Sequence, residues 1–267
     1  MPVTPQRLNI LAILDYTLPD PAPVLMQIGV ARLPDQHLLA ETLDLGDLPG
    51  AIHVAAHGSL GERSWLTPVE ALQVRYEAQV EIVREPVPLS NLFADALTVL
   101  PADAIEYLLP SRYCPVDTLH AASMEMFGNL AGGAAVEAAC DWIGSHLSYV
   151  PGASHGGTTA IDTFHSREGV CRDYAHLLVT LVRAIGIPAR VVSAYAPGVN
   201  PPDFHALAQV WLAGGWHLVD ATGMADPAQT AIIGIGRDAA DVAFLTIFGG
   251  AELNAQSVEV KLISPVG

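Results

Sequence analysis

The stretch "LQVRYEAQVEI" at residues 72–82 alternates between apolar and polar side chains without a break. Successive side chains of a β-strand point to opposite faces, so this pattern predicts a strand with one buried face in an antiparallel sheet. Shorter strand-like runs at 8–14, 24–33 and 51–57 are separated by clusters of proline, aspartate and glycine. Several strands without a convincing helix predict an N-terminal β-sandwich domain over residues 1–85, with a connector over 86–108.

From about residue 109 the pattern becomes mixed. Residues 135–149 carry apolar side chains with helical spacing, which places Cys140 on the buried face of a helix. A second helix is expected within "REGVCRDYAHLLVTLVRAIGIPARV" (167–191), ending at Gly186. A strand at 189–196 and a β-hairpin at 205–222 follow. We therefore predict an α+β fold, in which a helix packs on an antiparallel sheet, for a second domain over 109–267.

Composition narrows the possible functions. The formal net charge of −16 argues against nucleic-acid and membrane-surface partners, because such a surface repels phosphate groups. No apolar run approaches the roughly 18 residues of a spanning helix, and the start lacks the features of a signal peptide, so we expect a cytoplasmic protein. The three cysteines are expected to be reduced thiols without CxxC spacing, and neither a structural metal nor a cofactor is predicted.

Cys171 stands at the front of the predicted helix that follows Gly169. A free cysteine is most often a buried core residue, and this is the first interpretation to weigh. A helix N-terminus, however, offers unpaired N–H groups and a positive dipole end that favour a thiolate. A thiolate nucleophile needs a histidine and an orienting carboxylate, and the hairpin that follows carries His205 and Asp220.

The register of that hairpin decides whether the two residues meet. With a two-residue turn at 213–214, His205 lies diagonal to Asp220 on one face, at the roughly 7–8 Å that a histidine side chain can span. With a turn at 214–215, Asp220 lies opposite Gln209 instead, and His205 is out of reach. A triad of Cys171, His205 and Asp220 therefore requires the first register or a distortion of the second.

Two longer stretches, "REGVCRDYAHLLVTLVRAIGIPARVVSAY" and "DFHALAQVWLAGGWHLVDATG", resemble the transglutaminase-like superfamily, which includes papain-like cysteine proteases of microbes. "LLPSRYC" and "GRDAADVAFLTIFGG" resemble further segments of that family, so the match spans roughly residues 105–250. The resemblance implies a papain-like core with Cys171 as nucleophile, His205 as general base and Asp220 as the partner of the histidine. It also implies that the N-terminal region is the β-sandwich that often precedes this core.

The expected reaction is hydrolysis of an amide or peptide bond through a thioester, with the backbone N–H of Cys171 stabilising the oxyanion. The substrate would be a peptide or a small amide. Acyl transfer to an amine is the alternative reaction, and a catalytically silent peptide-binding module is the alternative class. A metal site of Cys171, His176 and His205 is the least favoured interpretation.

Other polar residues near the motif receive structural interpretations. His176 is expected to be a packed residue, and Asp173 to complement the helix N-terminus. His155 and His165 are expected to be solvated loop residues, and His217 is expected to be structural.

Overall fold

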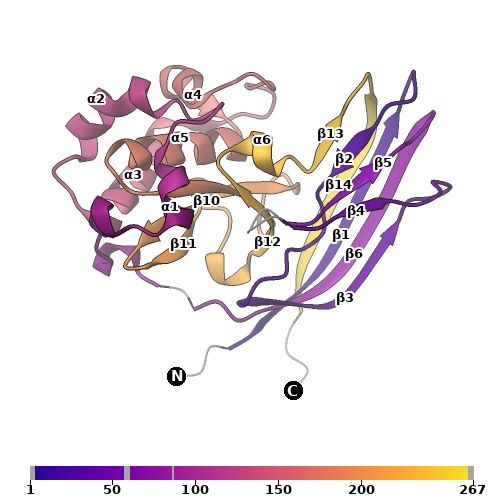
Figure 1. The fold of residues 1–267 in the computed structure, drawn as a ribbon, viewed down its shortest axis with the longest axis horizontal. Helices are drawn as coiled ribbons and strands as arrows, with labels where there is room; N and C mark the ends of the chain where they lie inside the picture. Colours follow the sequence, from indigo (N-terminus) through magenta and orange to yellow (C-terminus); the bar gives the residue numbers. More distant parts are fainter. Residues whose placement is uncertain (1–3, 57–60, 86, 264–267) are drawn as a thin grey trace.

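The computed structural model describes residues 4–56, 61–85 and 87–263, and within them it contains two four-stranded antiparallel sheets that share one apolar core. The first sheet has the order β14 (Glu252–Ile263), β1 (Gln6–Thr17), β6 (Ala71–Ile82) and β3 (Gln36–Asp44). The second has the order β13 (Leu245–Ile247), β2 (Val24–Met26), β5 (Arg63–Leu66) and β4 (Ile52–Val54). Figure 1 shows this sandwich on one side of the molecule.

The alternating stretch is strand β6, as the sequence predicts. Its apolar side chains are buried in the core of the sandwich, and most of its polar side chains are exposed. The run at 8–14 lies within β1, but the run at 24–33 forms a strand only over Val24–Met26. The run at 51–57 forms β4 over Ile52–Val54, and its last residue, His57, lies outside the described residues.

The end of the chain returns to the sandwich. The predicted division assigned residues 109–267 to the second domain, whereas β14 pairs along the whole of β1 from Arg7↔Ile263 to Thr17↔Glu252. Strand β13 likewise pairs with β2. Pairing of strands so distant in sequence leaves no local pattern, which is why the periodicity of the sequence did not reveal it.

The middle of the chain forms the α+β part. Its sheet has the order β11 (Gly215–Val219), β10 (His205–Leu212), β9 (Ala189–Tyr195) and β12 (Ala231–Gly236), and all three pairings are antiparallel. A short parallel pair joins β7 (Ser148–Tyr149) to β8 (Glu168–Gly169). The helices are α1 (Ala102–Ile105), α2 (Val116–Phe127), α3 (Gly132–His146), α4 (Ala160–Ser166), α5 (Cys171–Ala184) and α6 (Ala239–Val242). In the described ranges, no helix is both long and apolar enough to cross a bilayer.

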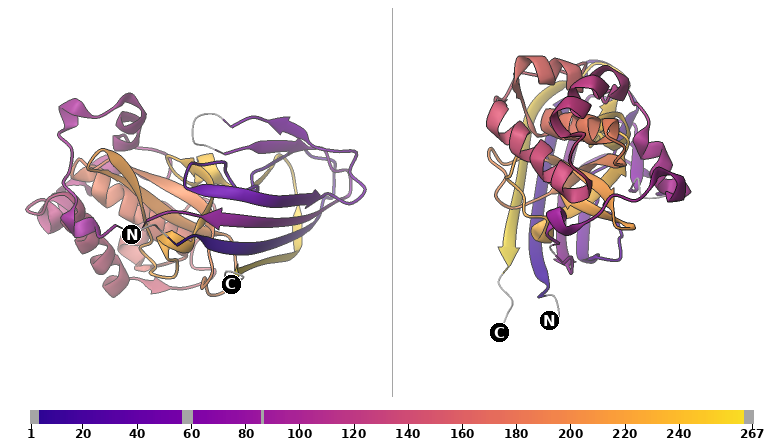
Figure 2. Two further views of the ribbon diagram at one scale, coloured as in Figure 1. Left: turned by 90° about the horizontal axis from the view of Figure 1, so that it is seen from below. Right: turned by 90° about the vertical axis from the view of Figure 1, so that its left-hand side faces the viewer.

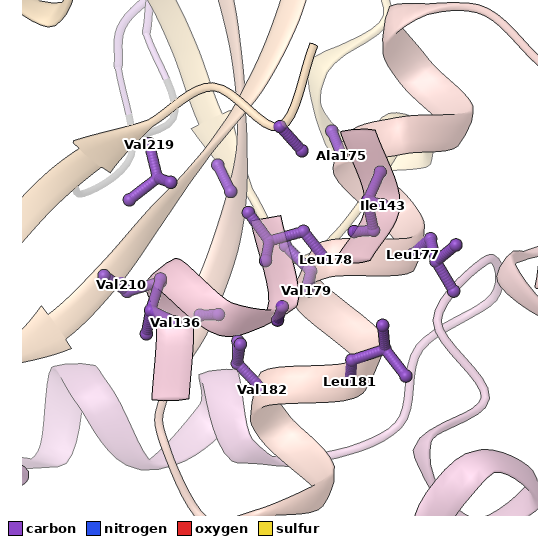
Figure 3. Packing of buried hydrophobic residues seen from close by; sticks show 14 of the residues in the cluster. Val136, Ile143, Ala175, Leu177, Leu178, Val179, Leu181, Val182, Val210 and Val219 are labelled. Atoms are coloured by element: carbon purple, nitrogen blue, oxygen red, sulfur yellow. The ribbon is translucent and has the colours of Figure 1, made fainter. Parts of the chain in front are cut away.

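Helix α5 is the centre of this part. Every residue from Asp173 to Ala184 is buried. Figure 3 shows Leu178, Val179 and Val182 of α5 close to Val136 of α3 and Val210 of β10. The helix ends as expected, because Gly186 adopts φ +85°, a left-handed conformation that side chains with a Cβ rarely take. An antiparallel sheet with a central buried helix is the predicted α+β core.

The connector contains a series of short helical turns. These are η1 (Leu89–Asn91), η2 (Leu97–Val99), α1 and η3 (Glu106–Leu108), while η4 (Pro227–Gln229) lies beyond the hairpin. A Cβ at Gly133 would lie 1.6 Å from the Leu89 carbonyl oxygen, so a glycine is needed where α3 meets the connector.

The two parts of the molecule pack against each other through the far face of the α+β sheet, as the views of Figure 2 also indicate. Ala31 contacts Val192 and Ile232 in a separate apolar cluster. The side chain of Gln36, in β3, pairs with the backbone of Ile232 as a neighbouring strand would. Its Nε2 donates to the Ile232 carbonyl at 2.8 Å, and its Oε1 accepts from the Ile232 N–H at 2.9 Å. These contacts hold the sandwich beside the sheet that carries His205.

Candidate active site

Cys171 is the first residue of α5, where the sequence predicts it. Val170 is extended and caps the helix, and its N–H donates to the Asp173 carboxylate at 2.8 Å. This confirms that Asp173 complements the helix N-terminus. Gly169 must be a glycine at this close approach, because a Cβ there would lie 2.6 Å from the Asp173 Cβ. The thiol therefore stands on a tight strand-to-helix junction, and the backbone N–H of Cys171, as the first residue of α5, has no acceptor within the helix.

The hairpin adopts the first of the two predicted registers. Ala208 lies opposite Val219 and Leu212 opposite Gly215, so the turn is Ala213–Gly214. Both turn residues have positive φ, at 50° and 77°, as a type I′ hairpin turn requires. Asp220 directly follows β11, and its carboxylate lies 2.9 Å from Nε2 of His205, the first residue of β10.

The Asp220 carboxylate is held by the loop that follows it. It accepts hydrogen bonds from the N–H groups of Thr222 at 2.9 Å, Met224 at 3.1 Å and Ala225 at 2.8 Å, and from the Thr222 hydroxyl. Burial alone would raise the pKa of Asp220, but the hydrogen bond and charge of His205 and the backbone donors outweigh it and lower the pKa. Asp220 is thus a fixed anion behind the histidine.

His205 is buried between this anion and Cys171. Burial disfavours the charged ring, but hydrogen bonds with Asp220 and Cys171 and their negative charges raise the pKa of His205 to about 9. Nε2 faces Asp220, which leaves Nδ1 buried and without a hydrogen-bond partner among the described residues, while the Cys171 thiol points to the Phe204 carbonyl oxygen at 4.0 Å. Such a histidine can hold a proton beside a thiolate over a wide pH range.

A cavity of about 330 Å³ opens over the thiol. Phe204, Ala206 and Val191 form its apolar wall on the sheet side. Phe244 and Leu245, the first residue of strand β13 of the sandwich, add further apolar lining. The rings of Phe204 and Phe244 stack with centroids 4.4 Å apart, so the lining from the two parts of the molecule is in direct contact. The C-terminal segment therefore completes the cleft.

Tyr149 is a site residue that sequence reasoning missed. It lies on β7 beside Gly169 of β8, close enough to Cys171 that the charge and the hydrogen-bonding groups of Cys171 affect the pKa of its phenol. Burial and the negative charge of Cys171 raise the pKa of Tyr149 to about 12, so the phenol stays protonated at neutral pH. Two residues of parallel pairing form no recognisable pattern, so the available signal was only a tyrosine shortly before the cysteine motif.

The histidines outside the triad are placed as follows. His176 is buried, stacks on Tyr113 and accepts the Ala239 N–H at 3.1 Å, and burial lowers its pKa to about 4. It is a packed residue, as predicted. His217 contacts the Leu212 carbonyl oxygen at 3.0 Å within the hairpin, a structural contact. His155 contacts the Gly157 N–H through its ring, and His165 lies in the last turn of α4.

The other cysteines do not line this cavity. Cys114 is fully buried in the core around α5, and Cys140 packs half-buried against that core, as its helical pattern predicts. Across residues 4–56, 61–85 and 87–263, no group of histidine, cysteine and carboxylate side chains is arranged to hold a metal ion.

The geometry can be compared with known proteins. The sequence profile of the transglutaminase-like superfamily matches residues 125–221, the stretch that contains Cys171, His205 and Asp220. A solved structure from Cytophaga hutchinsonii, described as a "Putative Cysteine Protease", superposes with a TM-score of 0.91 and 31% identity, covering 98% of this chain and 92% of that chain. The chain belongs to the transglutaminase-like superfamily. The α+β core preceded by sheets is accordingly the fold of a transglutaminase-like cysteine protease.

Curated relatives align over shorter stretches. An uncharacterized protein of Mycobacterium leprae is 34% identical over 59% of this chain, and the match spans 60% of that protein. A protein-glutamine gamma-glutamyltransferase of Pseudomonas aeruginosa is 38% identical over 25% of this chain and 12% of its own length. The chain therefore matches 60% of the length of the first relative and 12% of the second, less than two thirds of either.

Proposed function

We propose that the protein is a cysteine hydrolase of amide or peptide bonds in which Cys171, His205 and Asp220 form the catalytic triad. The observation that carries this proposal is that Cys171 and His205 line one open cavity, with His205 Nε2 held 2.9 Å from the Asp220 carboxylate. A cytoplasmic location remains a prediction from the sequence.

The proposed reaction begins with an imidazolium–thiolate pair. The thiolate attacks the carbonyl carbon, and the electron pair of the C=O bond moves to the oxygen. His205 Nδ1 then donates its proton to the departing nitrogen, the C–N bond breaks and a thioester remains. Water gives a proton back to His205 and attacks the thioester, which releases the carboxylic acid and restores the thiolate. No step requires a metal or a cofactor.

The oxyanion would lie beside Cys171. The N–H of Cys171 at the start of α5 is one donor, and the protonated phenol of Tyr149 supplies the second. The substrate oxygen would then accept from both groups. This assignment accounts for a half-buried phenol whose pKa is raised by the neighbouring Cys171.

Replacement of Tyr149 by phenylalanine tests that role. We expect kcat on an amide substrate to fall by about 10²-fold with little change in KM, because the donor acts on charge that develops only in the transition state. Tyr174→Phe is the matched control, since Tyr174 packs against Tyr149 with ring centroids 5.9 Å apart, but only burial, and not Cys171, raises the pKa of its phenol. Equal losses in the two variants would contradict the assignment.

Alkylation by iodoacetamide, mapped to each cysteine as a function of pH, tests the nucleophile. Burial raises the pKa of Cys114 to about 11 and that of Cys140 to about 12, so neither should react in the folded protein at neutral pH. Cys171 lines the open cavity beside His205 and should be modified well below about pH 8. Equal inertness of all three thiols would rule out the thiolate mechanism.

Acyl transfer to an amine is the second candidate function. It is favoured by the similarity of part of this chain to the protein-glutamine gamma-glutamyltransferase of P. aeruginosa. Both reactions pass through the same thioester and differ only in the group that attacks it. Mass analysis of the products with and without a primary amine separates them: a free acid in both samples supports hydrolysis, and an amine conjugate supports transfer.

A further inference from the structure

Few charged residues line the cavity, and only one of them lacks an ion-pair partner within the described part of the chain. Beside Cys171 and His205, the only charged residues among its lining are Arg172 and Asp203. We propose that Asp203 recognises a positively charged group of the substrate, an ammonium or a guanidinium, and so selects cationic amides. This inference rests on the proposed function only in that the cavity over Cys171 binds the substrate.

The side chain of Asp203 is held by hydrogen bonds and is accessible to solvent. It is exposed and directly precedes Phe204 and His205. Its Oδ1 accepts the Phe204 N–H at 2.7 Å and the side-chain amide of Gln256 at 2.5 Å, so strand β14 of the sandwich holds the carboxylate in place. Among the residues that the structure describes, no lysine, arginine or histidine forms an ion pair with it. Oδ2 is therefore left for an external cation.

Arg172 does not cancel this charge. Its guanidinium lies 3.3 Å from the buried carboxylate of Asp173 and donates to the His155 carbonyl at 2.9 Å and the Ser154 hydroxyl at 3.2 Å. Arg172 is thus neutralised by its neighbour and held toward the loop at 154–155. The field of Asp203, in contrast, reaches the reacting groups, since it helps raise the pKa of Tyr149. A substrate that enters the cavity meets a net negative wall.

The cation at this wall would be a recognition group. A carboxylate stabilises the protonated form of a bound amine, and a protonated amine has no electron pair for attack on a thioester. Asp203 therefore suits a lysine-like or arginine-like side chain, or a terminal ammonium, that stays charged throughout the reaction. It does not suit the attacking amine of an acyl transfer.

The rate of modification of Cys171 by charged thiol reagents measures this field without a known substrate. Three methanethiosulfonates are compared, carrying trimethylammonium, sulfonate or a neutral methyl group. In each, the thiolate attacks the sulfenyl sulfur, a mixed disulfide forms and methanesulfinate leaves. Modification is mapped to Cys171 by mass, and the neutral reagent corrects for changes in the nucleophilicity of the thiolate.

We expect the cationic reagent to react faster than the anionic one, and Asp203→Asn to reduce that ratio about threefold to tenfold, less at high salt. Asp44→Asn is the matched control, because Asp44 also accepts a nearby backbone N–H, that of Gly46 at 2.9 Å, on an exposed strand away from the cavity. An unchanged ratio in Asp203→Asn would overturn the inference. Slow reaction of Cys171 with all three reagents would instead refute the proposed nucleophile.

A second measurement identifies the source of the cation. Peptide amides carry lysine or the neutral norleucine on the acyl side or on the leaving-group side of the scissile bond. Asp203→Asn should raise KM about threefold to tenfold for lysine on one of the two sides, relative to norleucine, and Asp203→Glu should restore part of the preference. The side that responds shows which half of the substrate carries the cation. No lysine preference on either side of the bond in the unmodified protein would contradict the inference.

Discussion

Replacing Cys171 by alanine is expected to abolish amide hydrolysis, with kcat at least about 10⁴-fold below that of the unmodified protein. The thioester cannot form without the sulfur, and no other thiol lines the cavity. Rates are measured with a peptide amide substrate. Intact mass analysis of the quenched reaction should show an acyl adduct on the unmodified protein and none on Cys171→Ala.

Cys140→Ala is the control for this change. Cys140 is half-buried on α3 and does not line the cavity, so its removal should leave kcat within about twofold while costing some stability through the lost packing. Cys171→Ala removes a partly exposed side-chain atom at a helix N-terminus, and its melting temperature should stay close to that of the unmodified protein. Full activity of Cys171→Ala would disprove the covalent mechanism.

Asp220→Asn is expected to lower kcat about 10³-fold to 10⁴-fold. The carboxylate accepts from Nε2 of His205, so the neutral amide removes the charge and, because its NH2 group can also donate to the ring, no longer fixes the tautomer of His205. The pKa of His205, about 9 with Asp220 present, should fall in the variant. Because the imidazolium–thiolate pair requires a protonated ring, the basic limb of the kcat/KM profile should move from near pH 9 to lower pH.

Asp226→Asn controls for the loss of a carboxylate in the same loop. Asp226 is exposed and caps η4 by accepting the Ala228 N–H at 2.9 Å, without contact to His205. Its replacement should leave kcat and the basic limb of the profile unchanged. A profile of Asp220→Asn that kept its basic limb would show that Asp220 does not set the charge of His205.

The residues of the triad could be proposed from the sequence because each lies at a recognisable local feature. Cys171 stands at a helix start, His205 opens a strand and Asp220 follows the partner strand. Whether His205 and Asp220 can contact each other depended on the position of the hairpin turn, at 213–214 or at 214–215. The structure has the turn at 213–214. A hairpin register is a local property, because the turn residues alone determine which side chains face each other.

The walls of the cleft could not be derived in this way. Phe244 and Leu245 reach the cavity because β13 and β14 return to the sandwich, and Tyr149 reaches Cys171 through a two-residue parallel pair. Gln256 of β14 likewise holds Asp203. Each of these contacts joins segments that are distant along the chain.

The sequence by itself determined the strand at 72–82, the buried helix from Cys171 and a hairpin with two possible registers, because periodicity and turn chemistry act over a few residues. The structure selected the register that brings His205 and Asp220 together. Only the tertiary structure decided which strands close the sandwich and which side chains surround the thiol. Those contacts depend on how whole sheets pack. Any apolar surface of suitable shape is stabilised by burial, so the sequence of these residues does not indicate which distant segment they will contact.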